Sequence, residues 1–109
     1  MMKHKEVTDY EINKAVAKYL KLNIIAYDRT GIVLFDDMDA MPFDPCNNPA
    51  DAMPIIIENK ICMNYIDKDI GWGARHFDEE KGELEIYDKH YYRAAMICFL
   101  IMKEAENEK

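Results

Sequence analysis

The sequence has no apolar run long enough to cross a membrane. Its longest run, Ala94–Met102, has nine residues, whereas a transmembrane helix needs about 20. The first residues, "MMKHKEVTDYE", include basic side chains but no apolar segment behind them, which argues against a secretory signal. We therefore expect a cytoplasmic protein that does not interact with membranes.

Positive charge is scarce. Lysine and arginine number 14 against 21 acidic residues, and the net charge at pH 7 is −7. Proteins that bind nucleic acids normally carry a basic stripe that displaces counterions from phosphates, but the densest basic stretch here is the short segment Lys3–Lys5. The charge therefore disfavours direct binding to DNA or RNA.

Cysteine, glycine and proline are also sparse. The three cysteines, at positions 46, 62 and 98, form no C-x-x-C pair, which argues against a zinc knuckle or a thioredoxin-like motif and favours free, mostly buried thiols. Glycine and proline number four each, and half of the residues are hydrophobic. A packed core is expected, and residues 1–109 are predicted to form a single domain.

The first predicted helix begins at Thr8, which forms a capping box with Glu11. Asn13 falls on the polar side of this helix, and Asn23 is predicted to end it in a left-handed conformation. The apolar residues that recur at helical spacing are Ile12, Ala15, Val16, Tyr19 and Leu20.

A β-hairpin and a second helix are predicted next. Ile24–Tyr27 and Ile32–Phe35 read as strands joined by the turn "DRTG". After the polar loop 36–48, Asn48 caps a short helix with Pro49 at its first position. Pro54 is expected to kink that helix or to make its start irregular, because it removes a backbone donor.

The last third of the chain is predicted to form a meander of three strands, "ICMNYI", "GWGARHF" and "ELEIYD", followed by a helix over residues 89–106 capped by Asp88. Glu83 and Glu85 alternate with Leu84 and Ile86, which indicates one solvated sheet face. The predicted fold is α+β: an antiparallel sheet (hairpin plus three-stranded meander) packed against N- and C-terminal helices, with a short middle helix.

Cys46 is the strongest candidate for catalytic chemistry. It lies two residues before Asn48, and the start of a helix lowers the pKa of a thiol. No base is placed near it by the sequence, so we interpret Cys46 as a small residue packed under the helix. The alternative is a hydrolytic or ligand-binding protein with a cleft near Cys46, Asp44 and His76.

The acidic loop could in principle hold a hard cation through Asp36, Asp37, Asp39 and Asp44. It lacks the glycine and the closing glutamate of an EF-hand loop, so a solvated loop is the preferred interpretation. No nucleotide-binding or hydrolase motif is present. We expect no metal, no cofactor and no catalytic residues.

Binding is predicted for the loop 36–48 and the start of the second helix. Loops of this length are often functional, and an apolar centre with an acidic border suits a basic or amphipathic protein partner. Alternatively, Met41 and Phe43 tuck into the core. Trp72 is interpreted as a core residue on a central strand or as part of an exposed patch. The candidate residues are Asp39, Met41, Phe43, Asp44, Asn47, Asn48, Trp72 and Arg75.

Three stretches together resemble the NinX-like family of small bacteriophage and prophage proteins. They are "INKAVAKYLKLNI" (12–24), "DPCNNPADAMPIIIENKI" (44–61) and "RAAMICFLIMKE" (93–104). The resemblance rests on the "AVAK" helix, the "PII-E" segment, the "AAM-x-C-F" helix and a W-x-A element at Trp72–Ala74. The sequence departs from the family at Ala52-Met53, where two glycines are usual, and at Cys46, where serine is common.

The resemblance implies a protein made in an infected or lysogenic bacterium, in a family without an established activity. We expect a non-catalytic accessory protein, a monomer or small homo-oligomer, that binds an unidentified host or phage protein. An acidic DNA mimic is a third possibility, although a net charge of −7 over 109 residues is modest.

Overall fold

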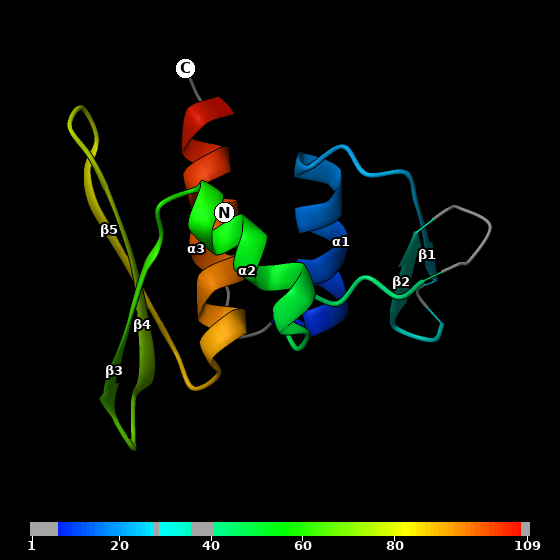
Figure 1. The fold of residues 1–109 in the computed structure, drawn as a ribbon, viewed down its shortest axis with the longest axis horizontal. Coiled ribbons are helices and arrows are strands. Elements are labelled where there is room, and N and C mark those ends of the chain that lie inside the picture. Colours follow the sequence, from blue (N-terminus) through cyan, green and yellow to red (C-terminus); the bar gives the residue numbers. More distant parts are fainter. Residues whose placement is uncertain (1–6, 28, 36–40, 108–109) are drawn as a thin grey trace.

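The computed structural model describes residues 7–27, 29–35 and 41–107. Three helices and five strands succeed one another along these residues (Figure 1). They are α1 (Asp9–Tyr19), β1 (Ile24–Tyr27), β2 (Ile32–Phe35), α2 (Pro49–Glu58), β3 (Cys62–Asp67), β4 (Gly71–Asp78), β5 (Gly82–Asp88) and α3 (Tyr91–Asn107).

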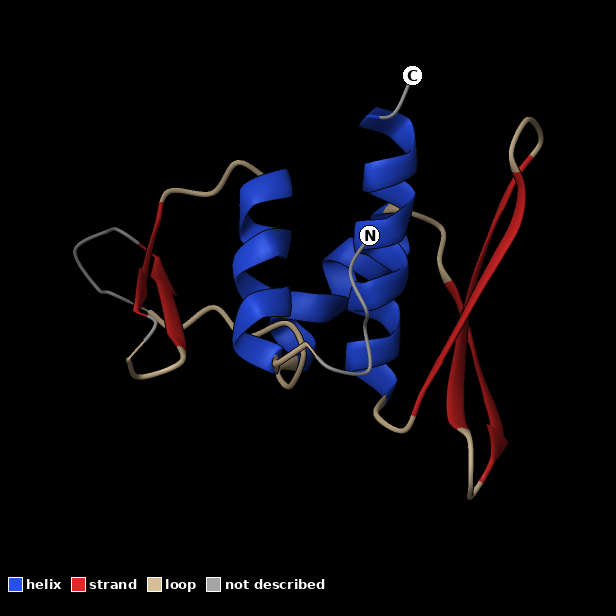
Figure 2. Cartoon of the chain, turned by 180° about the vertical axis from the view of Figure 1, so that it is seen from behind, coloured by secondary structure: helices blue, strands red, loops and turns tan. Residues whose placement is uncertain are grey.

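Helix α3 lies at the centre of a layered arrangement. It packs on one side against β4 and β5 and on the other against α1 and α2. The β1–β2 hairpin lies beyond α1, at the opposite end of the molecule from the three-stranded sheet (Figures 1 and 2). The predicted α+β class is confirmed, with the hairpin forming a sheet of its own, separate from the β3–β4–β5 meander.

The start of α1 is as predicted, but its end is not. The capping box is complete: the Thr8 side chain accepts from the Glu11 backbone, and the Glu11 carboxylate accepts from Thr8. The left-handed residue is Lys21, with φ 59°, rather than Asn23. The Leu22 N–H then donates to the Ala17 carbonyl, which completes a Schellman motif and turns Leu22 back towards the core.

Helix α2 is capped by Asn48 and has Pro49 at its first position, as predicted. It continues through Pro54, and its last turn ends in a second Schellman motif, with Lys60 left-handed at φ 56°. Here the Ile61 N–H donates to the Ile56 carbonyl. Both motifs return an apolar residue to the core immediately after the helix.

Helix α3 begins at Tyr91, two residues later than predicted. Asp88 belongs to β5, and its carboxylate accepts from the His90 N–H at 2.9 Å. The centre of the helix is buried on all sides, as its apolar sequence predicts. The buried residues are Ala94, Ala95, Met96, Ile97, Cys98, Phe99, Leu100 and Met102.

The meander has one face against α3 and one in solvent. In the antiparallel register Ala74 lies opposite Ile86, and His76 opposite Leu84, on the face that α3 covers. Glu83 and Glu85 are exposed, as the alternation predicts. Strand β4 is central, and β3 and β5 are the two edges.

Candidate functional site

The chain that follows the acidic loop is fixed to the β1–β2 hairpin. The Phe35 N–H donates to the Met41 carbonyl at 2.8 Å, and the Phe43 N–H donates to the Val33 carbonyl at 2.7 Å. Residues 41–43 thus lie alongside β2, with Pro42 opposite Leu34 in an isolated antiparallel bridge. This pairing buries Phe43, whose ring packs edge-to-face on Phe35 with centroids 5.4 Å apart.

Asn13 attaches the next part of the loop to α1. Its side chain is 5% exposed. Its Nδ2 donates to the Asp44 carboxylate at 2.7 Å, and its Oδ1 accepts from the Cys46 backbone N–H at 3.1 Å. Both the nitrogen and the oxygen of the Asn13 amide therefore hold the loop, so this residue, which the sequence places on the polar side of the helix, is buried.

Asp44 is the centre of this arrangement. Its carboxylate also accepts from Asn47 Nδ2, at 3.1 and 3.2 Å, and its backbone N–H donates to the Asp51 carboxylate at 2.9 Å. Asn47 Nδ2 lies 3.2 Å from an Asp9 oxygen as well. The loop is thereby tied to α1 and to the first turn of α2.

Arg93 extends the arrangement to the sheet and to α3. Its guanidinium pairs with Asp9 at 2.5 Å and with Asp88 at 3.2 Å, and it also donates to the Val7 carbonyl. The Arg93 side chain is mostly buried. The planar guanidinium presents its donors in a fixed geometry, with one N–H group directed at each of these three acceptors, so the start of α1 is held between the loop and α3.

A pocket of about 240 Å³ opens between α1, β2 and the loop. Its polar wall carries the two carboxylates of Asp9 and Asp44. Its apolar wall includes Ile32, which is 45% exposed. The lining residues are Asp9, Tyr10, Asn13, Gly31, Ile32, Val33, Pro42, Phe43, Asp44 and Asn47. This pocket gathers three of the residues predicted from the sequence to bind a partner.

Cys46 lies beneath this loop and is buried. Burial raises the pKa of its thiol far above the ordinary value, and the nearby Asp9 carboxylate raises the pKa further. A thiolate is the nucleophilic form of cysteine. The side chain of Cys46 therefore stays protonated, as a thiol of low reactivity. This agrees with the interpretation of Cys46 as a packing residue.

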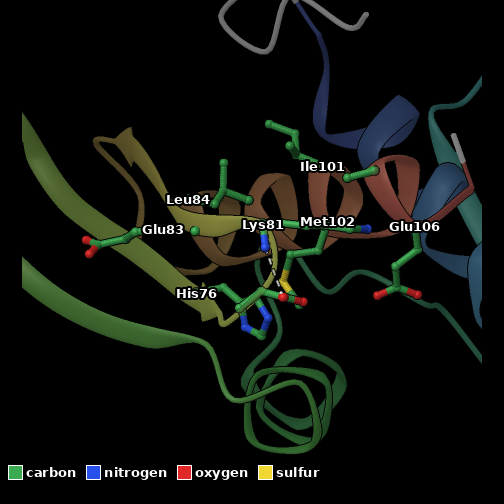
Figure 3. Close-up of a pocket in the computed structure, with 10 residues that line it drawn as sticks. His76, Lys81, Glu83, Leu84, Ile101, Met102 and Glu106 are labelled. Carbon is green, nitrogen blue, oxygen red and sulfur yellow. Dashed lines mark hydrogen bonds between the residues drawn. The ribbon is translucent and has the colours of Figure 1, made fainter. Parts of the chain in front are cut away.

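His76 does not join Cys46 and Asp44 in a cleft. It lies instead in a pocket of about 210 Å³ between the β4–β5 hairpin and the C-terminal half of α3. Figure 3 shows Leu84 on the strand side of this pocket and Ile101 and Met102 on the helix side. The Nδ1 atom of His76 is buried without a hydrogen-bond partner among the described residues.

The other predicted residues are dispersed. Met41 is 55% exposed beside the pocket, whereas Phe43 is 4% exposed, so Phe43 supports the loop from below. Asn48 is occupied in capping α2. Trp72 and Arg75 lie on the three-stranded sheet, away from the loop, and Asp39 lies outside the described residues, as do Asp36 and Asp37.

Trp72 is half-buried and forms part of an aromatic row. Its ring packs edge-to-face between Tyr65, at 5.2 Å, and Tyr91, at 4.9 Å. Arg75 is exposed and forms an ion pair with Glu83 at 3.5 Å. Neither residue contributes to the pocket at the loop.

The sequence-based prediction missed Asn13, Asp9 and Arg93. Asp9 and Arg93 are separated by 84 residues, and no local pattern connects them. Asn13 did leave a signal, because it lies four residues before Ala17, which is buried, and so on the same helical stripe.

The described part of the chain contains neither a metal-binding cluster nor a membrane-spanning helix. No group of three or more histidine, cysteine, aspartate or glutamate side chains is gathered there in a position to bind a metal ion. None of the helices described there has the length and apolar character needed to span a bilayer.

Comparison with known proteins identifies one family. The family model described as "Bacteriophage P22, NinX" matches residues 3–103 of the chain. No curated protein matches it.

Proposed function

Because the chain belongs to the bacteriophage P22 NinX family, and is accordingly a phage accessory protein, we propose that it acts without catalysis, by binding a protein of the phage or of its bacterial host. The contact surface is the pocket between α1, β2 and the loop, together with Met41 at its edge. We refer to residues 41–48 with this pocket as the loop site.

One observation carries the proposal: the polar groups at the loop site are held rigidly while apolar side chains beside them face solvent. Asp44 is fixed by Asn13 and Asn47, whereas Ile32 and Met41 are 45% and 55% exposed. A surface that is already ordered loses little conformational entropy when a partner binds. The arrangement supports recognition better than chemistry, since the buried Cys46 thiol has a raised pKa.

The chemistry of the loop site favours a basic, amphipathic segment of the partner. Asp9 and Asp44 place two carboxylates on one wall of the pocket, of which Asp9 is already paired with Arg93, and no lysine or arginine is among the described residues that line it. An apolar side chain of the partner would contact Ile32 and Pro42, and a neighbouring cation would lie near the carboxylates. Complementary charge of this kind mainly gives specificity and speeds association.

The test compares Ile32→Ser and Met41→Ser with Ile57→Ser as baits in phage-infected bacteria. Ile57 is 63% exposed on α2 and does not line the pocket, so it is a matched control for the loss of an exposed apolar side chain. We expect a discrete protein to be captured by the wild type and by Ile57→Ser, and to be lost with the other two variants. Equal capture by all four proteins would contradict the proposal, provided that their melting temperatures agree.

A further inference from the structure

The pocket between the β4–β5 hairpin and the C-terminal half of α3 lies across α3 from the loop site. We refer to this space, whose lining includes His76, Leu84, Ile101, Met102 and Ala105, as the hairpin pocket. Its walls are largely apolar, and its volume is about 210 Å³. An apolar cavity of about 150 Å³ holds a benzene molecule. The hairpin pocket therefore has room for a six-membered ring with a small substituent.

His76 brings to this pocket a polar atom that the described part of the structure does not satisfy. Its Nδ1 is buried, and no described residue forms a hydrogen bond with it. Buried polar atoms without a partner are rare in native proteins, because the hydrogen bonds that they lose to water are not replaced. A molecule bound in the hairpin pocket would supply the missing hydrogen bond.

Met102 lies next to the His76 ring and controls access to it. In Figure 3 the Met102 side chain extends from α3 towards the imidazole, and it is 8% exposed. A methionine side chain is unbranched and adapts its rotamer to what it packs against. Met102 can therefore turn aside and admit a ligand to the imidazole while the helix backbone stays in place.

The charges around the hairpin pocket are balanced. Each of the three carboxylates among its lining residues already has a partner: Glu83 pairs with Arg75 at 3.5 Å, Glu106 pairs with Lys103 at 3.6 Å, and Asp78 accepts from the backbone N–H groups of residues 80 and 81. In Figure 3 the Glu83 side chain also points away from His76 and Leu84. Lys81, which lines the pocket as well, adds a positive charge in the same turn as Asp78. The surroundings thus favour neither an anion nor a cation.

We propose that the hairpin pocket binds a small uncharged molecule with an apolar ring and one hydroxyl group. The ring lies against Leu84 and Ile101, and the hydroxyl forms a hydrogen bond with Nδ1 of His76. A hydroxyl suits Nδ1 in either tautomer of the neutral imidazole, because it both donates and accepts. A charged group would lose its hydration in an apolar pocket without gaining a free counter-charge.

This inference does not depend on the loop site, and two methionines allow the two pockets to be followed separately. Met102 lines the hairpin pocket, whereas Met41, which is 55% exposed, lies at the loop site. The probe is phenol, added to the purified full-length chain with carbon-13 in its methionine methyl groups. We expect phenol to shift the NMR signal of Met102 saturably, with a dissociation constant on the order of 1 mM, and to leave that of Met41 unchanged.

Toluene and His76→Phe test the role of Nδ1. Toluene has nearly the shape of phenol but no hydroxyl, and His76→Phe keeps an aromatic ring while removing both ring nitrogens. In this variant the affinity for phenol should fall about fivefold or more relative to that for toluene. Ala105→Leu fills the pocket and should abolish the binding of both molecules. Ala50→Leu, at an exposed position of α2 outside the pocket, is the matched control and should leave both affinities unchanged.

Benzoate and benzylammonium test the class of ligand on the wild-type protein, so the proposal stays open to contradiction even where a variant fails to fold. Both should bind more weakly than phenol. Equal or tighter binding of either ion would overturn the proposal. So would the absence of a saturable Met102 shift at phenol concentrations on the order of 10 mM, a shift at Met41 in its place, or an unchanged ratio of phenol to toluene affinity in His76→Phe.

Discussion

Asn13 and Asp44 are joined by a 2.7 Å hydrogen bond between residues 31 positions apart in the sequence. The same Asn13 amide accepts from the backbone of Cys46, so a single buried side chain makes two of the contacts that hold the loop on α1. Helix, loop and pocket are consequently one unit.

Replacing Asn13 with alanine should therefore destabilise the protein by about 2–3 kcal/mol, because the buried Cys46 N–H loses its acceptor. Asn13→Asp should be destabilising as well, since its carboxylate would face that of Asp44. Urea unfolding measures both changes, and Asn107→Ala, at an exposed position of α3, is the control. A loss below about 0.5 kcal/mol for Asn13→Ala would mean that the loop is not held by this amide.

The ends of α1 and α2 offer a stabilising change. Lys21 and Lys60 adopt φ values of 59° and 56°, which cost a non-glycine residue about 1 kcal/mol or more. Lys21→Gly and Lys60→Gly should each raise the free energy of unfolding by roughly 0.5–1 kcal/mol, since glycine adopts this conformation without strain. Thermal melts would detect the gain, and a decrease in both variants would contradict the cap assignment.

Glycine is required at Gly82 because of its positive φ alone, and at Gly71 because of both its positive φ and the nearness of other backbone atoms. Both have positive φ, but a Cβ at Gly71 would lie 2.5 Å from the Lys89 Cα and 2.6 Å from the Asp88 carbonyl, whereas a Cβ at Gly82 meets nothing within 4 Å. Gly82→Ala should cost about 1–2 kcal/mol. Gly71→Ala should cost about 3 kcal/mol or more, because backbone atoms must move. If denaturant unfolding shows that both variants lose the same free energy of unfolding, the backbone at Lys89 moves at little energetic cost.

Alkaline pH should destabilise the fold through its buried thiols. Burial, with a smaller contribution from Cys62, raises the pKa of Cys98 to about 12 from the ordinary 9.0. Between these values the unfolded chain releases the proton and the folded chain retains it, so stability is complete below pH 9 and falls towards pH 12. The slope for Cys98 should reach about 1.4 kcal/mol per pH unit.

Unfolding free energies across this pH range test the effect. Cys98→Ala should reduce the fall in unfolding free energy per pH unit relative to the wild type. Cys62→Ala, at an exposed position, should retain most of that fall. An unchanged slope in Cys98→Ala would show that this thiol ionises normally in the folded state.

Local features of the fold were predictable because short-range chemistry determines them. The Thr8–Glu11 capping box, the Asn48 cap and both strands of the first hairpin are found where their residue patterns predict. The end of α1 was misplaced because two signals compete there. Asn23 has the residue type suited to a left-handed stop, but burial of Leu22 requires the turn at Lys21.

The candidate site was less predictable because its contacts are not local. Asp9 and Arg93 meet only after α1 and α3 pack together. The position of Asn13 on the helical stripe of Ala17 indicates that it could be buried, but the sequence does not show which groups its amide binds. The exposure of Met41 and the burial of Phe43 follow from the pairing of residues 41–43 with β2. That pairing depends on backbone hydrogen bonds which residue types do not reveal.

Site-specific photo-crosslinking in infected bacteria tests the proposed binding surface most directly. A photoreactive residue replaces Met41 in one bait and Ile57 in another, since both positions are exposed. The loop site should yield a discrete crosslink from position 41 to a phage or host protein, and position 57 should yield none. A partner that crosslinks at position 57 but not at position 41 would contradict the assignment of binding to the loop.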